Sequence, residues 1–428
     1  MNQQKQRIFN RIDDNRVAIL DRSRLLFDTP ELGYREVETG RLIRGWLDGW
    51  GVPYESVSYT GLMVTLGQGA PVVAVLADMD GLPKKAGEGR IHSCGHSLQP
   101  SAALALIEAM KDEPLSGTLK VIFTPAEEMI DFDYRQSLVD RGLVKYPSGK
   151  QDMIARGVFD DVDAVLSCHA SGEPGCRFDV GSTLKGFVIF KAVYQGLGAH
   201  AGAAPFAGKN ALHAAVLAQT GVAFLKDRFD PRDGVNVQPV ISEAAGTVNI
   251  VPDRAVVETY VRARTEEALF AAADLVENCL KRCGQALDIE TEVARRPGFL
   301  PLSQSGEINA LVKANMLLLC GEDQIREDLL SGASGDVGDI GALLPTVQFG
   351  FTGVSGRFHG DDFAVTNEEN ACLCPPKILA GTVLDLLERP VSGRPGFAER
   401  KARYLKTWLG EERAYEQSRR MSGGFCYG

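Results

Sequence analysis

Short, almost wholly apolar segments alternate with helical ones over the first 180 residues, and this alternation constrains the fold most. Residues 71–78 (PVVAVLAD), 117–125 (GTLKVIFTP) and 163–171 (DAVLSCHAS) are typical of central strands that are buried on both faces. A helical pattern at 100–112 separates the first two of them. Strands that alternate with helices predict an α/β fold with a parallel sheet in a three-layer arrangement.

The pattern changes near residue 184 and predicts a second, inserted domain. From there to residue 297 the apolar periodicity predicts the order β-α-β-β-α-β, which is that of a ferredoxin-like α+β domain. We therefore expect a first domain built from residues 1–183 and 298–390, interrupted by an insertion at 184–297. Residues 391–428 are rich in charge and predict a helical C-terminal tail.

Composition argues against several classes of partner and location. The net charge of −10 argues against a nucleic-acid partner, which would need a basic face. No apolar run approaches the roughly 20 residues that a membrane span requires, and the charged N-terminus lacks the apolar core of a secretion signal. Nine cysteines without paired spacing then indicate reduced thiols in the cytoplasm.

Residues 92–96 read His92-Ser93-Cys94-Gly95-His96, a candidate metal-binding cluster. In an extended segment His92, Cys94 and His96 project to one side, so two or three of them could reach one ion. Thiolate and imidazole ligands suit manganese, zinc, cobalt or nickel. A buried cysteine between two hydrogen-bonded histidines is the alternative for this cluster taken alone.

Acidic side chains follow the predicted strands where each strand ends. Asp78 and Asp80 follow the first strand and Glu127 and Glu128 the second, while His169 ends the third. In such sheets ligands bind beyond the carboxyl ends of the strands. A second glutamate beside a ligand glutamate could accept a proton from a water that the metal activates. The sequence therefore predicts a metal-dependent hydrolase.

The remaining histidines are harder to assign from their surroundings. His200 lies in a small-residue turn of the expected insertion, so it could reach the site only if that domain folds over it. His213 lies within a helical pattern and is interpreted as structural. His359 follows a glycine-containing stretch, residues 353–358.

Up to about residue 390 the chain resembles the metal-dependent amidohydrolase family of aminoacylases, glutamate carboxypeptidases and auxin-conjugate hydrolases. Several segments match that family in the same order, which is far more specific than any one match. These segments are TPELGY (29–34), ADMDGLP (77–83), HSCGH (92–96), IFTPAEE (122–128), GAHA (198–201), NIVPD (249–253) and FHGDDFAV (358–365).

The resemblance implies roles for the residues of the first domain. It implies that Glu127 is the general base and that Asp78 orients a histidine ligand. It also implies a set of metal ligands that two ions share, with the cysteine bridging: Cys94, His96, Glu128, His169 and His359.

For the insertion, the resemblance implies a lid and a homodimer interface. His200 would reach the active site of the other subunit and stabilise the developing oxyanion. Asn249 and Arg262 would hold a substrate carboxylate or oxyanion. The chain departs from the family pattern after His96, where it has Ser97-Leu98-Gln99 in place of Asp-x-His, so that one ion or two could bind.

The implied function is hydrolysis of a C–N bond in a small carboxylate-bearing substrate, first of all the amide of an N-acyl or N-aroyl amino acid. A second possibility is hydrolytic release of ammonia from an aromatic amine, because the family includes a nitroanthranilate aminohydrolase. The remote alternative is a non-catalytic binding protein on the same fold.

Overall fold

The computed structural model describes all residues except 1, 174, 245, 392–395 and 411–428, and the chain forms two compact units. The first unit comprises Met1–Thr183, Ser303–Ser331 and Asp339–Lys401. The second unit comprises Leu184–Leu302, Gly332–Gly338 and the described residues from Ala402 onward.

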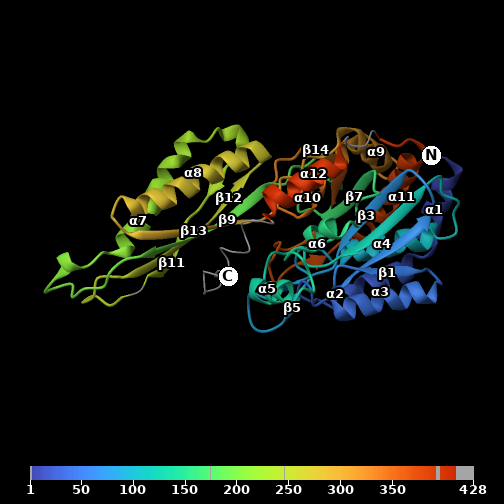
Figure 1. Cartoon of the computed structure of the whole chain (residues 1–428). Helices are drawn as coiled ribbons and strands as arrows, with labels where there is room; N and C mark the ends of the chain where they lie inside the picture. The colour runs from blue at the N-terminus through green and yellow to red at the C-terminus, as the bar shows by residue number, and fades with distance from the viewer. Residues whose placement is uncertain (1, 174, 245, 392–395, 411–428) are drawn as a thin grey trace. The chain divides into compact units, whose positions relative to one another are not determined.

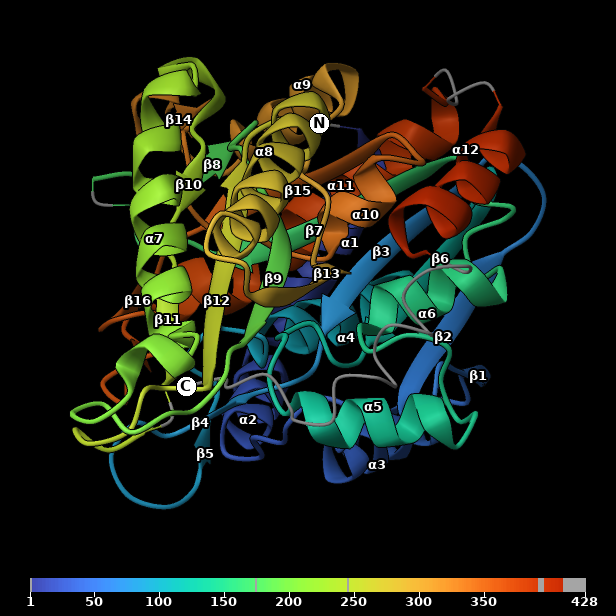
Figure 2. The same cartoon turned by 60° about the vertical axis from the view of Figure 1, so that its left-hand side comes forward.

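The first unit (Figure 1) is built on an eight-stranded sheet with the order β1-β2-β6-β3-β7-β15-β8-β14, and all eight strands are labelled in Figure 2. Its strands are β1 (Tyr54–Val57), β2 (Gly61–Gly67), β3 (Val72–Asp78), β6 (Thr118–Thr124), β7 (Ala164–Ala170), β8 (Phe178–Val180), β14 (Ile325–Glu327) and β15 (Thr346–Phe351). Two small hairpins are β4 (Leu82–Pro83) with β5 (Arg90–Ile91), and β16 (Val354–Ser355) with β17 (Ala364–Val365).

The sheet is mixed, which corrects the expectation of a parallel one. Strands β6, β3, β7 and β15 are parallel to one another, as predicted for the centre. Toward the edges, β1 pairs antiparallel with β2, β2 with β6, and β8 with β15. The short turn between β1 and β2 explains the first of these, because parallel neighbours need a long crossover connection.

Helices cover both faces of this sheet, so the predicted three-layer α/β class is confirmed (Figure 2). Val73, Val75 and Ala77 of β3 belong to one core with α4 and α11, whereas the side chain of Asp78 contacts Lys150 of α6 on the other face. The α-helices are α1 (Gln3–Asp14), α2 (Arg16–Phe27), α3 (Val37–Gly49), α4 (Leu98–Met110), α5 (Phe132–Asp140), α6 (Gly149–Arg156), α9 (Gly306–Met316), α10 (Val337–Gly341), α11 (Cys374–Glu388) and α12 (Phe397–Arg403).

The second unit follows the predicted β-α-β-β-α-β order, except that one predicted strand is divided into two short ones. Its elements are β9 (Gly186–Gln195), α7 (Ala211–Phe224), β10 (Asn236–Val237), β11 (Val240–Ala244), β12 (Arg254–Ala263), α8 (Glu266–Gln285) and β13 (Glu290–Pro297). The sheet is antiparallel, with β12 between β9 and the pair β10 and β11, and with β13 on the other side of β9. Helices α7 and α8 pack against each other (Figure 1).

Residues 392–395 and 411–428 of the predicted tail lie outside the described residues. Between these two gaps, the described part of the tail contains the helix α12. Among the helices that the structure describes, none has both the length and the apolar composition needed to cross a membrane.

Candidate active site

The structure brings the five predicted metal ligands together beyond the carboxyl ends of the central strands. Cys94, His96 and His169 form one group, the first triad, and Cys94, Glu128 and His359 form another, the second triad. Within each triad the candidate ligand atoms lie within 4.8 Å of one another. Cys94 Sγ is 3.7 Å from His169 Nε2, and His359 Nε2 is 3.2 Å from Glu128 Oε1. Cys94 is therefore the residue that the two triads share.

Glu127 lies beside the triads. Its Oε2 is 3.9 Å from His96 Nε2, and its side chain is 13% exposed. Glu127, His96 and Glu128 also form a group whose ligand atoms lie within 4.8 Å. A carboxylate in this place can reach both a metal ion and a reacting water.

The loops of the site contain residues with unusual backbone conformations. Ala126 and His359 have φ of +57° and +59°, conformations that cost non-glycine residues roughly 1–3 kcal/mol and that cluster at functional sites. The His359 N–H donates to the Ser93 carbonyl at 3.0 Å, which ties His359 to the loop of residues 92–96. Gly95 has φ of +83°, and a Cβ there would lie 2.7 Å from Ala170 Cβ.

The hydrogen bonds of His169 and His96 fix which ring nitrogen is available to a metal. Nδ1 of His169 lies 2.8 Å from the Ala170 carbonyl, and Nδ1 of His96 lies 3.0 Å from the Asp80 carbonyl. Carbonyls only accept, so both Nδ1 atoms carry a proton, and Nε2 is the nitrogen of each ring that a metal ion could bind when the ring is neutral. Nε2 of His96 is buried without a hydrogen-bond partner among the described residues. This orphaned nitrogen fits a metal ligand.

The charges of the site also suit a cation. Burial and the charge of His96 lower the pKa of His169 to about 4, so its ring is neutral near pH 7. Burial raises the pKa of the Cys94 thiol, and the nearby Glu128 charge adds to this rise, which a bound cation would oppose. Burial opposes ionisation of Glu128, but its hydrogen bond with His359 and the charge of His96 together hold its pKa below the usual value.

The carboxylate that contacts the candidate ligand His96 is Asp80, not the predicted Asp78. Asp80 Oδ1 lies 3.2 Å from His96 Nδ1. The Asp78 carboxylate instead accepts hydrogen bonds from Lys150 and Thr124. Asp78 is the last residue of β3 and points to the face that α6 covers, whereas Asp80 lies past the strand and is free to turn toward the ligands.

Sequence reasoning missed Glu36 and Arg135, both of which are fully buried behind the loop of residues 125–128. Glu36 accepts a hydrogen bond from the Ala126 N–H at 2.8 Å and another from the Thr60 hydroxyl at 2.6 Å. Glu36 lies two residues after the matched segment TPELGY, and this proximity was the available signal. No sequence feature near Arg135 indicated a role at the site.

Glu36→Gln is expected to flatten the pH dependence of stability. Burial and the nearby Asp80 charge raise the pKa of Glu36 from 4.5 to about 7. Between these values the folded protein keeps a proton that the unfolded chain has lost, so the free energy of unfolding falls as pH rises, by about 3 kcal/mol at most. Urea unfolding at pH 5 and pH 8 measures the difference. Glu38→Gln, at an exposed site on α3, is the control. An equal pH dependence in Glu36→Gln and wild type would contradict the prediction.

The other predicted residues, His200, Asn249 and Arg262, lie in the second unit. Nδ1 of His200 accepts from the backbone N–H groups of Gly202 and Ala203 at 3.2 and 3.0 Å, so Nε2 of this exposed ring is the protonated nitrogen. His200 also pairs with Ile250, the residue after Asn249, in an isolated β-bridge.

Arg262 lies apart from that bridge, on β12. Its Nη1 donates to Ser334 Oγ at 2.9 Å, and its guanidinium lies 5.3 Å from the centre of the Phe187 ring. Burial lowers the pKa of Arg262 from its usual value. An arginine held in this way presents fixed donors for a carboxylate or oxyanion.

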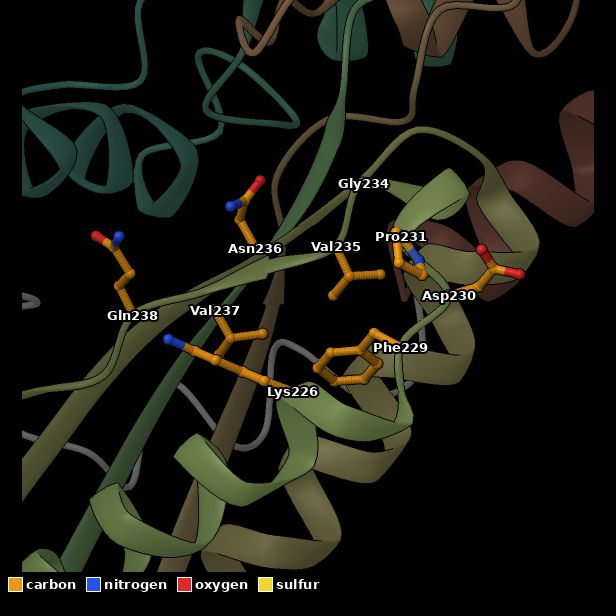
Figure 3. Close-up of a pocket in the computed structure, with 9 residues that line it drawn as sticks. All are labelled: Lys226, Phe229, Asp230, Pro231, Gly234, Val235, Asn236, Val237 and Gln238. Atoms are coloured by element: carbon orange, nitrogen blue, oxygen red, sulfur yellow. The ribbon is translucent and has the colours of Figure 1, made fainter.

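The second unit also has a pocket of about 280 Å³ (Figure 3). Phe229 and Val235 point toward each other in it, while Asn236 and Gln238 point away (Figure 3). Its lining residues are Lys226, Phe229, Asp230, Pro231, Gly234, Val235, Asn236, Val237 and Gln238. This lining has no histidine, cysteine or glutamate and none of the predicted site residues, although Asn236 pairs with Arg262 across β10 and β12.

Comparisons with known proteins agree with this geometry. The model of peptidase family M20/M25/M40 matches residues 74–381. The IAA-amino acid hydrolase ILR1-like 5 of Arabidopsis thaliana is 27% identical over 361 residues, which cover 78% of each protein. Hippurate hydrolase of Campylobacter jejuni is 27% identical over 286 residues, which cover 63% of this chain and 70% of that protein.

A solved structure with the same fold is that of the Bacillus subtilis YXEP protein, described as a dinuclear metal-binding peptidase of the M20 family. The two structures superpose with a TM-score of 0.68 at 20% sequence identity, and the match covers 88% of this chain and 99% of the other.

Proposed function

The chain belongs to peptidase family M20/M25/M40, whose named relatives hydrolyse amide bonds, and on this premise we propose that it hydrolyses small N-acyl or N-aroyl amino acids. The observation that carries the proposal is the convergence of the two triads on Cys94, with Glu127 beside them. Relatives named for IAA-amino acids and hippurate support a substrate with an aromatic acyl group and a free carboxylate.

The cofactor in this proposal is a divalent transition metal, chosen from manganese, zinc, cobalt and nickel. One thiol, three imidazoles and one carboxylate are donors that such ions accept. The first triad would hold one ion and the second triad another, an arrangement that the dinuclear YXEP protein makes plausible. When bound, the metal lowers the pKa of a coordinated water to about 7 and polarises the substrate carbonyl.

In the proposed mechanism Glu127 takes a proton from the attacking water and passes it to the leaving nitrogen. Its carboxylate lies beside the triads and is partly exposed, which suits a group that must meet both water and substrate. His200 would donate from Nε2 to the developing oxyanion, an interaction worth on the order of 3 kcal/mol. Asn249 and Arg262 would bind the substrate carboxylate or the oxyanion.

Hippurate and a nitroanthranilate, each offered to the metal-loaded protein, separate the two candidate reactions. We expect free glycine from hippurate and no ammonia from the nitroanthranilate, because the named relatives act on amides. Glycine and ammonia are assayed in parallel after the same incubation. Ammonia release without turnover of hippurate would replace the amidohydrolase proposal with an aminohydrolase.

We further propose a homodimer formed through the second unit. On α7, Val216 and Phe224 are 48% and 73% exposed, and Val240 on the edge strand β11 is 59% exposed. Exposed apolar side chains beside an unpaired strand edge mark an association surface.

The eight described cysteines carry free thiols, which supports a location in the reducing cytoplasm.

Phe224→Asp is expected to convert the dimer to a monomer at micromolar concentration, because it buries a charge in the apolar interface. Analytical ultracentrifugation of wild type and variant measures the change. Val17→Asp, at a site 72% exposed on the first unit, is the matched control and should leave the dimer intact. A wild-type protein that is already monomeric would refute the dimer.

A further inference from the structure

Arg135 is a fully buried arginine placed behind the loop that carries Glu127. It lies in the first turns of α5, the helix that follows Glu128 in the chain, and its side chain has no exposed surface. Its Nη1 donates to the carbonyls of Ala126 and Pro147 at 3.0 and 3.2 Å, and its Nη2 donates to the carbonyl of Glu128. The guanidinium therefore holds the backbone on both sides of Glu127.

The N–H groups of the same loop are held by two buried carboxylates. The Ala126 N–H donates to Glu36 Oε1 at 2.8 Å, and the Glu128 N–H donates to Asp80 Oδ2 at 2.9 Å. Ala126 keeps its positive φ within this set of contacts. Such a conformation persists only where the surroundings fix it, so the contacts with Arg135 and the carboxylates set the course of the loop.

Arg135 also reaches the ligands through Asp80. Its Nη2 lies 3.8 Å from Asp80 Oδ2, and Oδ1 of the same carboxylate contacts His96 Nδ1. The buried guanidinium of Arg135 thus faces the Asp80 carboxylate, which in turn orients the candidate ligand His96. Without it, the Asp80 charge would lose a nearby partner in a region of low dielectric, which is costly.

The space for the guanidinium depends on a glycine. A Cβ at Gly33 would lie 2.1 Å from Arg135 Nη2 and 2.8 Å from Ala126 Cα. No side chain other than hydrogen fits there without displacing the guanidinium or the loop. Gly33 and Arg135 therefore form one packing unit, although they are far apart in the sequence.

From these contacts we propose that Arg135 is a positioning residue, which sets the carboxylate of Glu127 against the metal ligands by bracing residues 126–128. The inference rests on the proposed function. Arg135 touches neither substrate nor metal in this proposal and acts through the loop backbone and through Asp80. A lysine keeps the charge but cannot supply the planar fork of donors that reaches the carbonyls on both sides of Glu127.

Arg135→Lys is expected to lower kcat by about 10–100-fold while KM for hippurate changes less than about threefold, because small misplacements of a catalytic group are costly. Metal content, measured by elemental analysis after loading with excess ion, should stay at the wild-type level. Arg141→Lys, at an exposed site at the end of α5, is the matched control. Wild-type kcat in Arg135→Lys would overturn the inference.

A second comparison separates positioning from general loss of structure. In a Glu127→Gln background, Arg135→Lys should have little further effect on the residual rate, because the group that it positions is already lost. An equal loss in both backgrounds would mean that Arg135 does not act through Glu127.

Two further cases are a variant that does not fold and a failure of the proposed function. If Arg135→Lys does not fold, Gly33→Ala displaces the guanidinium with its charge intact and should give the same fall in kcat; wild-type kcat there would overturn the inference. If the metal-loaded wild type releases no glycine from hippurate, the proposed function fails. An inactive Glu127→Gln with a fully active Arg135→Lys refutes the positioning role alone.

Discussion

Glu127→Gln is expected to lower kcat for hippurate by about 10³-fold and to leave KM and metal content close to those of wild type. Glutamine has nearly the same size and can keep most packing contacts, but it cannot accept a proton from water at neutral pH. The five triad residues remain in place in this variant, so the metal should still bind. Steady-state kinetics and elemental analysis of the same preparation measure both quantities.

The control for this prediction is Glu88→Gln, which removes an exposed glutamate from the loop between β4 and β5. It should leave kcat unchanged. Activity that survives intact in Glu127→Gln would remove the base from the mechanism. A loss of metal together with activity would instead mean that Glu127 is a ligand, as its group with His96 and Glu128 also allows.

The sequence predicted which of the candidate ligands lie together because local spacing and one fold rule carry that information. Cys94 and His96 are two residues apart, while Glu128 and His169 lie at the ends of apolar strands, and parallel strands bring such ends to one edge of a sheet. The central strands were recognisable because they are buried on both faces. The antiparallel edges were not, since pairing direction there depends on connections that have no apolar pattern of their own.

The residues that support the site were less predictable. The choice between Asp78 and Asp80 depends on where β3 ends, because the strand fixes the direction of the Asp78 side chain whereas Asp80 lies past its last residue. Arg135 and Glu36 reach the loop of residues 125–128 from α5 and from the start of α3. Each is an ordinary charged residue in its own segment, and only tertiary contacts reveal its place.

The departures from the family pattern also become interpretable. The segment that begins at Met129 continues into α5, and that helix supplies Arg135. Gln99, which stands where the family has a histidine, accepts a hydrogen bond from the Asp78 N–H at 3.0 Å. Neither Arg135 nor Gln99 belongs to a triad, so these differences leave all five triad residues in place.

Cys94→Ala is expected to abolish binding of both proposed ions, because Cys94 is the residue that the two triads share. The loss in affinity should exceed the roughly 10–100-fold that follows removal of an outer contact to a metal ligand. His169→Ala and His359→Ala each remove a residue of one triad, so each should lose one ion and keep the other. Elemental analysis after dialysis against a weak chelator gives the number of ions per chain.

Cys168→Ala is the matched control, since Cys168 is a buried thiol next to His169 that belongs to neither triad. It should keep the wild-type metal content. Full metal retention in Cys94→Ala would exclude ligation by the thiol, while loss of a single ion would confine Cys94 to one triad. The three variants together therefore test whether both triads share Cys94. Only a shared residue makes the number of ions lost in Cys94→Ala equal to the losses in His169→Ala and His359→Ala added together.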